Sequence, residues 1–432
     1  TPIPQVHEED KTVSIRYLID PGKRTYVRRI EIKGNTRTGD RVIRQQMQQM
    51  EGGIASATDI ERSKVKLDRT GFFRSVNVET IPVPGTTDQV DLEYTVEEQQ
   101  SGSFGASIGF AQDSGIILNL SVTQDNFLGS GKKVSFAVKN TDSTTEYSFS
   151  YLDPFYTVDG VSRGYNLYYR SRDFDEDDVS AYNTDEFGAG INFGYPIDDY
   201  QRLNFGANVE MVSINTALQT PQEIIDFISN EGNDYLNFIV KAGWSDNHLN
   251  KGIFPTEGYS QSASFELSVP GSDLGYYRSN YNMKYYYPLS EEHFWIVALR
   301  GGLGYAGDLG GNEYPFYKNF YAGGLRSVRG FKANTLGPKD TPQAGSTEDP
   351  NPFGGNVLMV GSAELIFPMP FIKDQSSWRT LAFFDAGNVF DTSCPVGSVN
   401  CEEGIELDEI RYSTGFGLSW LTPIGPLSIA IA

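Results

Sequence analysis

The sequence predicts a transmembrane antiparallel β-barrel that is preceded by a small soluble α+β module. Residues 102–432 repeat a segment of about ten residues in which apolar and small or polar side chains alternate, as in strands with lipid on one face and water on the other. The 432 residues include 25 Tyr and 27 Phe, a rich supply for the aromatic belts at the two membrane surfaces. No run approaches about 18 apolar residues, so we expect no membrane-spanning helix.

Residues 1 to about 100 predict the soluble module. The expected elements are strands at 11–20 and 26–33, helices at 40–50 and from 58 to about 69, and strands at 76–81 and 90–97. Val42, Ile43, Met47 and Met50 lie on one stripe of the first helix, which we expect to face a core. Residues 58–61 (TDIE) have the pattern of a capping box, which would begin the second helix.

From residue 101 onward the alternation predicts fifteen strands. Their approximate ranges are 102–111, 115–124, 131–140, 144–153, 161–172, 184–195, 200–213, 233–246, 257–269, 275–288, 293–306, 355–367, 378–389, 409–421 and 425–432. Residues 259–269 show the pattern best, because Tyr259 and Phe265 share one face while Glu266 and four serines share the other. Short connections alternate with long polar ones, as is usual in bacterial barrels, and we expect a short surface helix at 220–229 in one long loop.

The strand number and the chain ends predict a barrel that is cut short. Single-chain bacterial barrels have even strand numbers, whereas fifteen is odd and the chain stops at Ala432 inside a strand. We therefore expect a closing sixteenth strand to be missing; a miscount is the alternative. The chain starts at Thr1 without a signal peptide, although such a barrel must be exported, so we expect a processed or trimmed start.

Charge and cysteine content limit the possible ligands. The net charge of −21 argues against nucleic-acid binding. The acidic residues within 173–178 could form a solvated loop tip or a calcium site, but they lack a glycine-centred ligand loop, which favours the first reading. Cys394 and Cys401 lie in a polar loop and should form a disulfide in an oxidising compartment. A metal site would need more ligands, and the three histidines are scattered, so we expect no metal and no cofactor.

Several short segments point to one family. Residues 323–331 read GGLRSVRGF, and this segment contains a V-R-G-F/Y motif at Val328, Arg329, Gly330 and Phe331. The other segments are NTLGPK at 334–339, QMEG at 49–52, GFF at 71–73, QDNFLG at 124–129, DPF at 153–155 and GIFPTEG at 252–258. Together they resemble the BamA family of outer-membrane barrel-assembly proteins, and the resemblance covers nearly the whole chain.

The resemblance implies an organisation and a function. Residues 24–98 would be a periplasmic POTRA module, residues 1–23 the end of a preceding POTRA module, and residues 101–432 a sixteen-stranded outer-membrane barrel that stops before its closing strand. The protein would be the core subunit of the β-barrel assembly machine and would fold and insert outer-membrane proteins. Its partners would be periplasmic lipoproteins of the complex, unfolded outer-membrane protein clients and outer-membrane lipid.

The resemblance also suggests a role for Arg329. On its own this residue, in the long connection between strands 293–306 and 355–367, could be a solvent-exposed base. Alternation directs Glu364 into the lumen, and Asp385 is similarly placed. Because the corresponding loop of the family lies inside the barrel, we expect Arg329 to pair with Glu364 or Asp385 through charge-assisted hydrogen bonds.

The first barrel strand predicts a weak seam. Starting at Gly102, it directs Phe104 outward, whereas Gly105, Ser107 and Gly109 leave almost nothing on the inner face. Interior glycines weaken a strand. The strand could simply pack against an inserted loop. Alternatively, it pairs weakly with the last strand, so that the barrel opens laterally and templates client strands while the bilayer is locally destabilised.

Other functions and contacts have to be weighed. The patterns G-x-S-x-G at 105–109 and 160–164 lack the strand-to-helix turn of a hydrolase, so we expect no enzyme. A two-partner-secretion transporter shares the POTRA modules and the V-R-G-F/Y loop but usually has a plug helix, and a diffusion porin lacks the module. The edges of the module could accept an added strand or act as a spacer. Glu51 could form a salt bridge to a partner lipoprotein or be a solvated turn acid.

Overall fold

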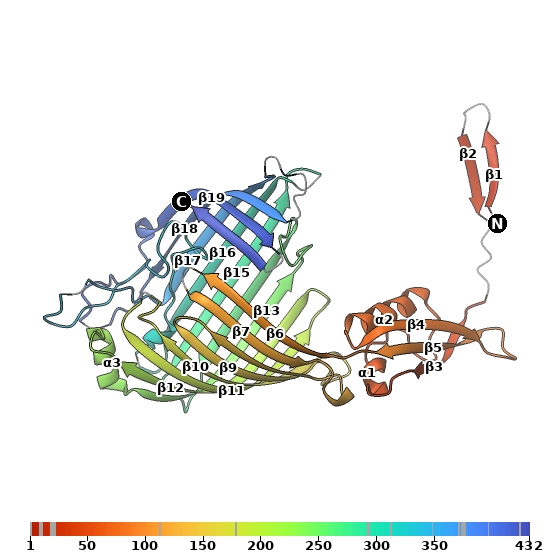
Figure 1. Ribbon diagram of the computed structural model, residues 1–432, viewed down its shortest axis with the longest axis horizontal. Coiled ribbons are helices and arrows are strands. Elements are labelled where there is room, and N and C mark those ends of the chain that lie inside the picture. The colour runs from red at the N-terminus through yellow and green to blue at the C-terminus, as the bar shows by residue number, and fades with distance from the viewer. Residues whose placement is uncertain are drawn as a thin grey trace. The chain divides into compact units, whose positions relative to one another are not determined.

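The computed structural model contains two compact units (Figure 1). It describes residues 2–7, 12–17, 23–111, 114–177, 179–291, 294–311, 313–347, 349–369, 372, 377–395, 397–422 and 425–432. The first unit consists of residues 1–102 together with 125–132, and the second of residues 103–124 and 133–432. None of the described helices is long and apolar enough to cross a membrane.

The first unit contains a hairpin and the α+β module. Its elements are β1 (Pro2–His7), β2 (Thr12–Tyr17), β3 (Tyr26–Lys33), α1 (Asp40–Arg44), α2 (Ala57–Arg69), β4 (Phe73–Pro82) and β5 (Gln89–Glu98). In the module, β5 lies between β3, to which it is parallel, and β4, to which it is antiparallel. Ile43 and Leu67 of the two helices pack with Leu92 and Tyr94 of β5 in the apolar core. The predicted order of elements from 26 to 98 is confirmed; residues 11 and 18–20 of the first predicted strand lie outside the described residues.

Both helices differ in extent from the prediction. Helix α1 ends at Arg44, and Met50 is 68% exposed, because the backbone N–H groups of Gln48 and Gln49 turn away to donate to Ser63 Oγ of α2. Helix α2 begins at Ala57 rather than Thr58. Its N-cap is Ser56, whose Oγ accepts a hydrogen bond from Asp59 N. The predicted capping box was therefore two residues too late.

The turn at residues 125–132 belongs to the packing of the first unit. Asn126 Nδ2 donates to Thr38 Oγ1 at 2.8 Å, and Gly39 N donates to Gly129 O at 2.9 Å. Gly131 has φ +70°, and a Cβ there would lie 2.7 Å from Val42 Cγ1. A side chain at this position would therefore be strained and would collide with the start of α1.

The second unit is one antiparallel sheet of fifteen strands, the number predicted. The strands are β6 (Gly102–Ala111), β7 (Gly115–Gln124), β8 (Lys133–Asn140), β9 (Thr144–Asp153), β10 (Ser162–Asp173), β11 (Tyr182–Pro196), β12 (Gln201–Thr216), β13 (Asp234–Asn247), β14 (Gly258–Ser268), β15 (Tyr276–Pro288), β16 (Ile296–Asp308), β17 (Val357–Phe367), β18 (Trp378–Phe390), β19 (Arg411–Thr422) and β20 (Gly425–Ile431). Neighbours in the sheet are neighbours in sequence, so β6 and β20 are its two edges. Figure 1 shows the sheet curling round into a barrel. A sixteenth strand stays a prediction.

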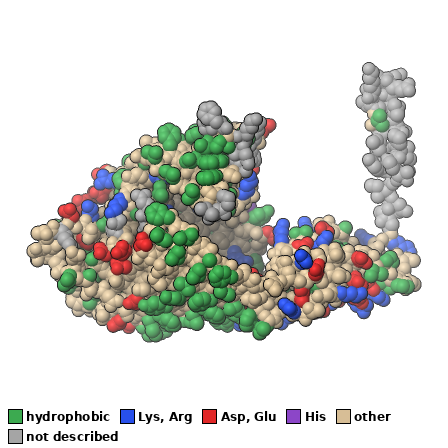
Figure 2. All heavy atoms as spheres, in the orientation of Figure 1, with side chains coloured by type: hydrophobic (Ala, Val, Ile, Leu, Met, Phe, Trp, Pro, Cys, Tyr) green, Lys and Arg blue, Asp and Glu red, His purple; other side chains and the backbone are tan. Residues whose placement is uncertain are grey.

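The outer face of the barrel is apolar along its strands. On β6 and β7 the exposed side chains include Phe104, Ile108, Phe110, Leu118 and Leu120. Figure 2 shows hydrophobic side chains over much of the visible outer face. This is the arrangement that the alternation predicted, because every second residue of a strand points to the same face.

The barrel interior is less polar than predicted. We call the end with the long connections the loop end; there, inward-facing side chains pack with loop residues into an apolar core. Its strand members include Val212, Ile214, Ile239 and Tyr276, and its loop members include Phe316, Phe320, Val328, Leu336 and Phe353. Inward positions near this end therefore face protein rather than water. The 3₁₀ turns η1 (Phe127–Gly129), η2 (Phe316–Lys318) and η3 (Leu407–Glu409) complete the described helices.

Two loop predictions were confirmed only in part. The predicted surface helix is α3 (Gln222–Glu231), but Ile224 and Phe227 are fully buried in the apolar core. In the acidic segment after β10, Asp175 and Glu176 are exposed, as predicted, whereas Asp177 is buried and accepts hydrogen bonds from Arg172. Asp178 of this segment lies outside the described residues. Sequence polarity underestimated how much of the loop end is packed.

Candidate functional site

The long connection between β16 and β17, residues 309–356, enters the barrel interior; we call it the inserted loop. Hydrogen bonds join its two arms, because Phe320 N donates to Gly355 O at 2.8 Å and Leu336 N donates to Ala322 O at 3.1 Å. Its Val328 is completely buried in the apolar core at the loop end. The loop therefore has a defined conformation that presents residues 328–331 to the barrel wall.

Arg329 contacts both acidic residues that alternation directed inward. Its Nε and Nη2 donate to Asp385 Oδ2 and Oδ1, each at 2.7 Å, and its backbone N–H donates to Oδ2 at 3.0 Å. Nη1 lies 2.8 Å from Glu364 Oε1. The sequence predicted one partner or the other, whereas the structure has both.

Three residues that the sequence did not single out complete this site. Ser362 Oγ accepts a hydrogen bond from Arg329 Nη2 at 2.9 Å, and Arg300 forms a second ion pair with Glu364. The ring of Phe383 lies 3.7 Å from Arg329 Cζ. The alternation could have identified Arg300 and Ser362, because both are polar residues on the inner face of their strands.

The three central residues of the site are buried, and its charges are balanced. Asp385 is 0% exposed, Glu364 5% and Arg329 6%, while two arginines face two carboxylates. An unpaired charge at this depth would be costly, so each member depends on the others. Only a planar guanidinium can form the bidentate contact with Asp385 while its face stacks on Phe383. A lysine could not reproduce both contacts.

The other residues of the V-R-G-F motif contribute to the packing of the loop tip. Gly330 has φ +88°, and a Cβ there would lie 2.8 Å from Ala432 Cβ, so a larger residue would push against β20. Phe331 packs partly buried against the apolar core. The tip of the loop therefore touches the last described strand of the sheet.

The two edge strands reach one cavity beside Arg329. This cavity of about 470 Å³ is lined by Ala111 at the end of β6, by Ala430 and Ala432 at the end of β20, and by the tip of the inserted loop. Along β6 nearly every residue is exposed, and a Cβ on Gly105 would lie 2.7 Å from Ser121 Oγ of β7. The absence of a side chain at Gly105 therefore leaves room for Ser121 of β7. Weak pairing of β6 with a last strand stays a prediction.

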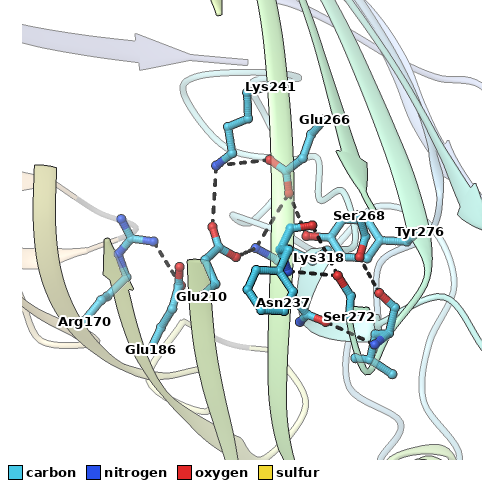
Figure 3. Close-up of polar contacts among 12 residues, drawn as sticks. Arg170, Glu186, Glu210, Asn237, Lys241, Glu266, Ser268, Ser272, Tyr276 and Lys318 are labelled. Carbon is cyan, nitrogen blue, oxygen red and sulfur yellow. Dashed lines mark hydrogen bonds and ion pairs between the residues drawn. The ribbon is translucent and has the colours of Figure 1, made fainter. Parts of the chain in front are cut away.

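A second charged cluster holds the first arm of the inserted loop (Figure 3). Lys318 Nζ lies 3.0 Å from Glu210 Oε2 of β12 and 3.9 Å from Glu266 Oε1 of β14. Lys241 of β13 lies 3.5 Å from Glu210 Oε1 and 3.3 Å from Glu266 Oε2. Tyr276 OH donates to Glu266 Oε1 at 2.7 Å. Alternation placed Glu266 on the polar face, but nothing in the sequence indicated its partner in the loop.

The remaining predicted residues lie outside the Arg329 site. Glu51 is engaged within the module, where its Oε1 accepts a hydrogen bond from Ile30 N at 2.8 Å and lies 3.3 Å from Arg44 Nη1. The bond to Ile30 and the pairing with Arg44 lower the pKa of Glu51 despite partial burial. A contact with a partner protein stays a prediction. The predicted disulfide between Cys394 and Cys401 is present.

The structure also gives the positions of the two G-x-S-x-G serines and of one cluster of carboxylates. Ser107 and Ser162 of the two G-x-S-x-G patterns lie in strands β6 and β10, not in strand-to-helix turns. The carboxylates of Glu402, Glu406 and Glu409 lie within 4.8 Å of one another and could hold a cation. They are exposed or half-exposed, as acidic loop residues commonly are.

Two sequence profiles match the chain. Residues 126–432 match the Omp85 superfamily domain, and residues 25–99 match the POTRA profile, described as a surface antigen variable number repeat. The chain is also 36% identical over 455 residues to the outer membrane protein assembly factor BamA of Neisseria meningitidis serogroup B. That alignment covers 99% of this chain and 56% of the Neisseria protein, so the chain spans little more than half of that relative.

Solved structures agree with these profiles. BamA from Haemophilus ducreyi lacking POTRA domains 1–3 superposes with a TM-score of 0.87 at 34% identity, covering 100% of this chain and 85% of that structure. CdiB from Acinetobacter baumannii superposes with a TM-score of 0.54 at 15% identity, covering 93% and 68%. The second match supports the fold alone.

Proposed function

Because the chain belongs to the Omp85 superfamily, we propose that it is the core of an outer-membrane assembly factor that folds β-barrel proteins and inserts them into the membrane. The barrel lies in the bacterial outer membrane and the POTRA module in the periplasm. The names and sequence identities of the BamA relatives support the proposal. No step requires covalent chemistry.

One observation carries the mechanism: the edge strands β6 and β20 and the tip of the inserted loop line the same cavity. Backbone groups at an unpaired sheet edge are costly in hydrocarbon. An incoming client strand would satisfy them by pairing with an edge strand. The Arg329 cluster supports this role, because it fixes the loop tip beside the end of β20.

The strands next to β6 are shorter than those of β11–β13. Strands β6, β7, β8 and β9 have 10, 10, 8 and 10 residues, whereas β11, β12 and β13 have 15, 16 and 14. A tilted strand needs about 9–11 residues to cross the hydrocarbon core. The strands near the seam therefore barely meet this requirement, which supports local thinning of the membrane where a client would enter.

Periplasmic lipoproteins of the assembly complex and unfolded outer-membrane proteins are the proposed partners. The three-stranded sheet of the module has two edge strands, β3 and β4, which could accept an extended segment by strand addition. The half-exposed Glu51 could contact a partner through its outer surface, although its Oε1 also serves Ile30 inside the module.

The alternative is a transporter of the two-partner-secretion type. The fold similarity to CdiB is compatible with it, but the identity to CdiB is 15% compared with 34% to the solved BamA structure. Reconstitution distinguishes the two. The full-length protein with its accessory lipoproteins, placed in lipid vesicles, should convert a urea-denatured porin into a membrane-inserted, protease-resistant form. Release of the client into the vesicle lumen, without insertion, would support the transporter instead.

A further inference from the structure

Inward-facing charged side chains form a row across six neighbouring strands of the barrel. In strand order from β9 to β14 they are Glu146, Arg170, Glu186, Glu210, Lys241 and Glu266. Arg170 pairs with Glu146 at 2.9 Å and with Glu186 at 3.3 Å, while Lys241 pairs with Glu210 and Glu266. The row is one continuous polar network inside the barrel.

The row carries more negative than positive charge. The row itself holds four carboxylates and two basic side chains, and beyond its two ends Lys139 of β8 lies opposite Glu146 and Arg278 of β15 lies opposite Glu266. Glu210 is 1% exposed, so water does little to stabilise its charge. Tyr168 OH lies 2.5 Å from Glu186 Oε1 and 3.1 Å from Glu210 Oε1, but it has one hydrogen to donate and contributes no charge. Among the described ion pairs, Glu210 and Glu266 share a single partner from the strands, Lys241.

Lys318 of the inserted loop supplies a further positive charge. It enters between these two carboxylates, as Figure 3 shows, and its side chain is largely buried. Its backbone carbonyl accepts a hydrogen bond from Tyr314 OH at 2.9 Å, and the adjacent Phe316 packs edge-on against Phe227 of α3. The lysine is therefore held by its backbone, its neighbours and its charge.

We propose that Lys318 is a positioning residue that anchors the first arm of the inserted loop to the barrel wall, independently of Arg329. The two residues bracket the segment 319–328, and they attach to different parts of the wall, β12–β14 and β17–β18. A loop fixed at one point can pivot, whereas a loop fixed at both ends of this segment cannot. Lys318 thereby keeps the motif at residues 328–331 beside β20.

The charge of Lys318, and not only its packing, makes the contact. An apolar side chain of similar length would leave Glu210 and Glu266 with Lys241 as their shared ion-pair partner from the strands. Two carboxylates that contact the same ammonium group repel each other, and more strongly in a largely buried cluster than in water. Loss of the lysine should therefore weaken loop docking, and removal of one of the two carboxylates should partly restore it. This compensation would not occur if Lys318 only filled space.

The experiment measures loop release directly in the full-length protein. A cysteine is introduced at the buried position Ala322, where a thiol reagent can react only when the loop leaves its site. Cys394 and Cys401 are bonded to each other, so they do not compete for the reagent. Lys318→Met is compared with Lys339→Met, which makes the same chemical change at an exposed lysine of the same loop.

Lys318→Met should raise the labelling rate at position 322 about tenfold or more, as expected for a coupling within one network. Lys339→Met should leave the rate unchanged. Lys318→Arg keeps the positive charge and serves as the second variant in case Lys318→Met folds poorly. Its labelling rate should stay close to that of the protein with lysine at position 318. The double variant Lys318→Met with Glu210→Gln should label clearly more slowly than Lys318→Met alone.

Equal labelling of Lys318→Met and Lys339→Met would overturn the proposal, as would a double variant that labels as fast as the single one. The effect of Lys318 on client assembly rests on the proposed function, but the labelling rate does not. If Lys318→Met raises the labelling rate but the protein with Lys318 intact assembles no client, the role of Lys318 as an anchor is supported and the proposed function is not. The two conclusions can therefore be separated.

Discussion

Arg329 and Asp385 are joined by three hydrogen bonds, from the backbone N–H, Nε and Nη2 of the arginine to the two oxygens of one carboxylate. Because the backbone N–H of Arg329 also donates to this carboxylate, Asp385 holds the backbone of the loop in place as well as the arginine side chain. Asp385 is fully buried, so it has no alternative partner in water. The relationship ties a loop tip to a wall strand that lies 56 residues away in sequence.

Arg329→Ala should release the tip of the inserted loop. The change leaves Asp385 without its cation, and removing one partner of a buried ion pair costs about 3–5 kcal/mol, less if water enters the lumen. Protease sensitivity of the loop in detergent should increase, and assembly of a porin client should fall. Arg329→Lys should restore little, because lysine cannot form the bidentate contact. Wild-type loop protection in Arg329→Ala would contradict this prediction, and Lys339→Ala serves as the control at an exposed basic residue of the same loop.

Locking the seam should stop client insertion if lateral opening is required. Cysteines placed on β6 and on the final strand of the full-length protein, then oxidised, would join the two edges covalently. We expect the oxidised form to lose porin insertion and to recover it on reduction, because the edge groups become available again. Full activity of the locked form would leave membrane thinning as the mechanism. A cysteine pair on β12 and β13, which are already paired, is the matched control.

The disulfide between Cys394 and Cys401 should be complete in the exported protein. Thiol labelling of the denatured, unreduced chain should detect no free cysteine, and labelling after reduction should detect two. The two cysteines are seven residues apart in one loop, so each is the nearest partner of the other. The compartment is oxidising, which favours the bond. Two labels before reduction would show that the bond does not form.

The module should loosen in acid through Glu98. Burial alone would raise the pKa of Glu98, but hydrogen bonds from Thr38, Thr36 and Arg37 outweigh it and lower the pKa from its ordinary 4.5 to about 2. A lowered carboxyl pKa stabilises the fold above pH 4.5, and this stabilisation is lost as pH falls towards 2. Hydrogen exchange of the segment 36–38 should therefore accelerate over this range, after correction for the intrinsic rate.

Glu98→Gln is the control for that acid response. A glutamine keeps the size of the side chain but cannot change charge, so its exchange profile should be flat between pH 4.5 and 2. An equally steep profile in Glu98→Gln would show that another group controls the segment.

The sequence by itself determined the strands and their faces. A β-strand repeats every two residues, so the outward direction of Phe104 and the inward direction of Glu364 and Asp385 follow from local pattern alone. The fold class and the number of strands were predictable for the same reason. The V-R-G-F motif also made Arg329 a candidate, although through resemblance rather than physics.

Only the tertiary structure decided how the inserted loop meets the wall. Lys318 lies 108 residues from Glu210 in sequence, and no local pattern links a loop lysine to two wall carboxylates. The buried face of α3 was missed for a related reason, since it depends on what packs against that helix. Alternation is a property of neighbouring residues, whereas burial and charge pairing depend on segments that meet only when the chain folds.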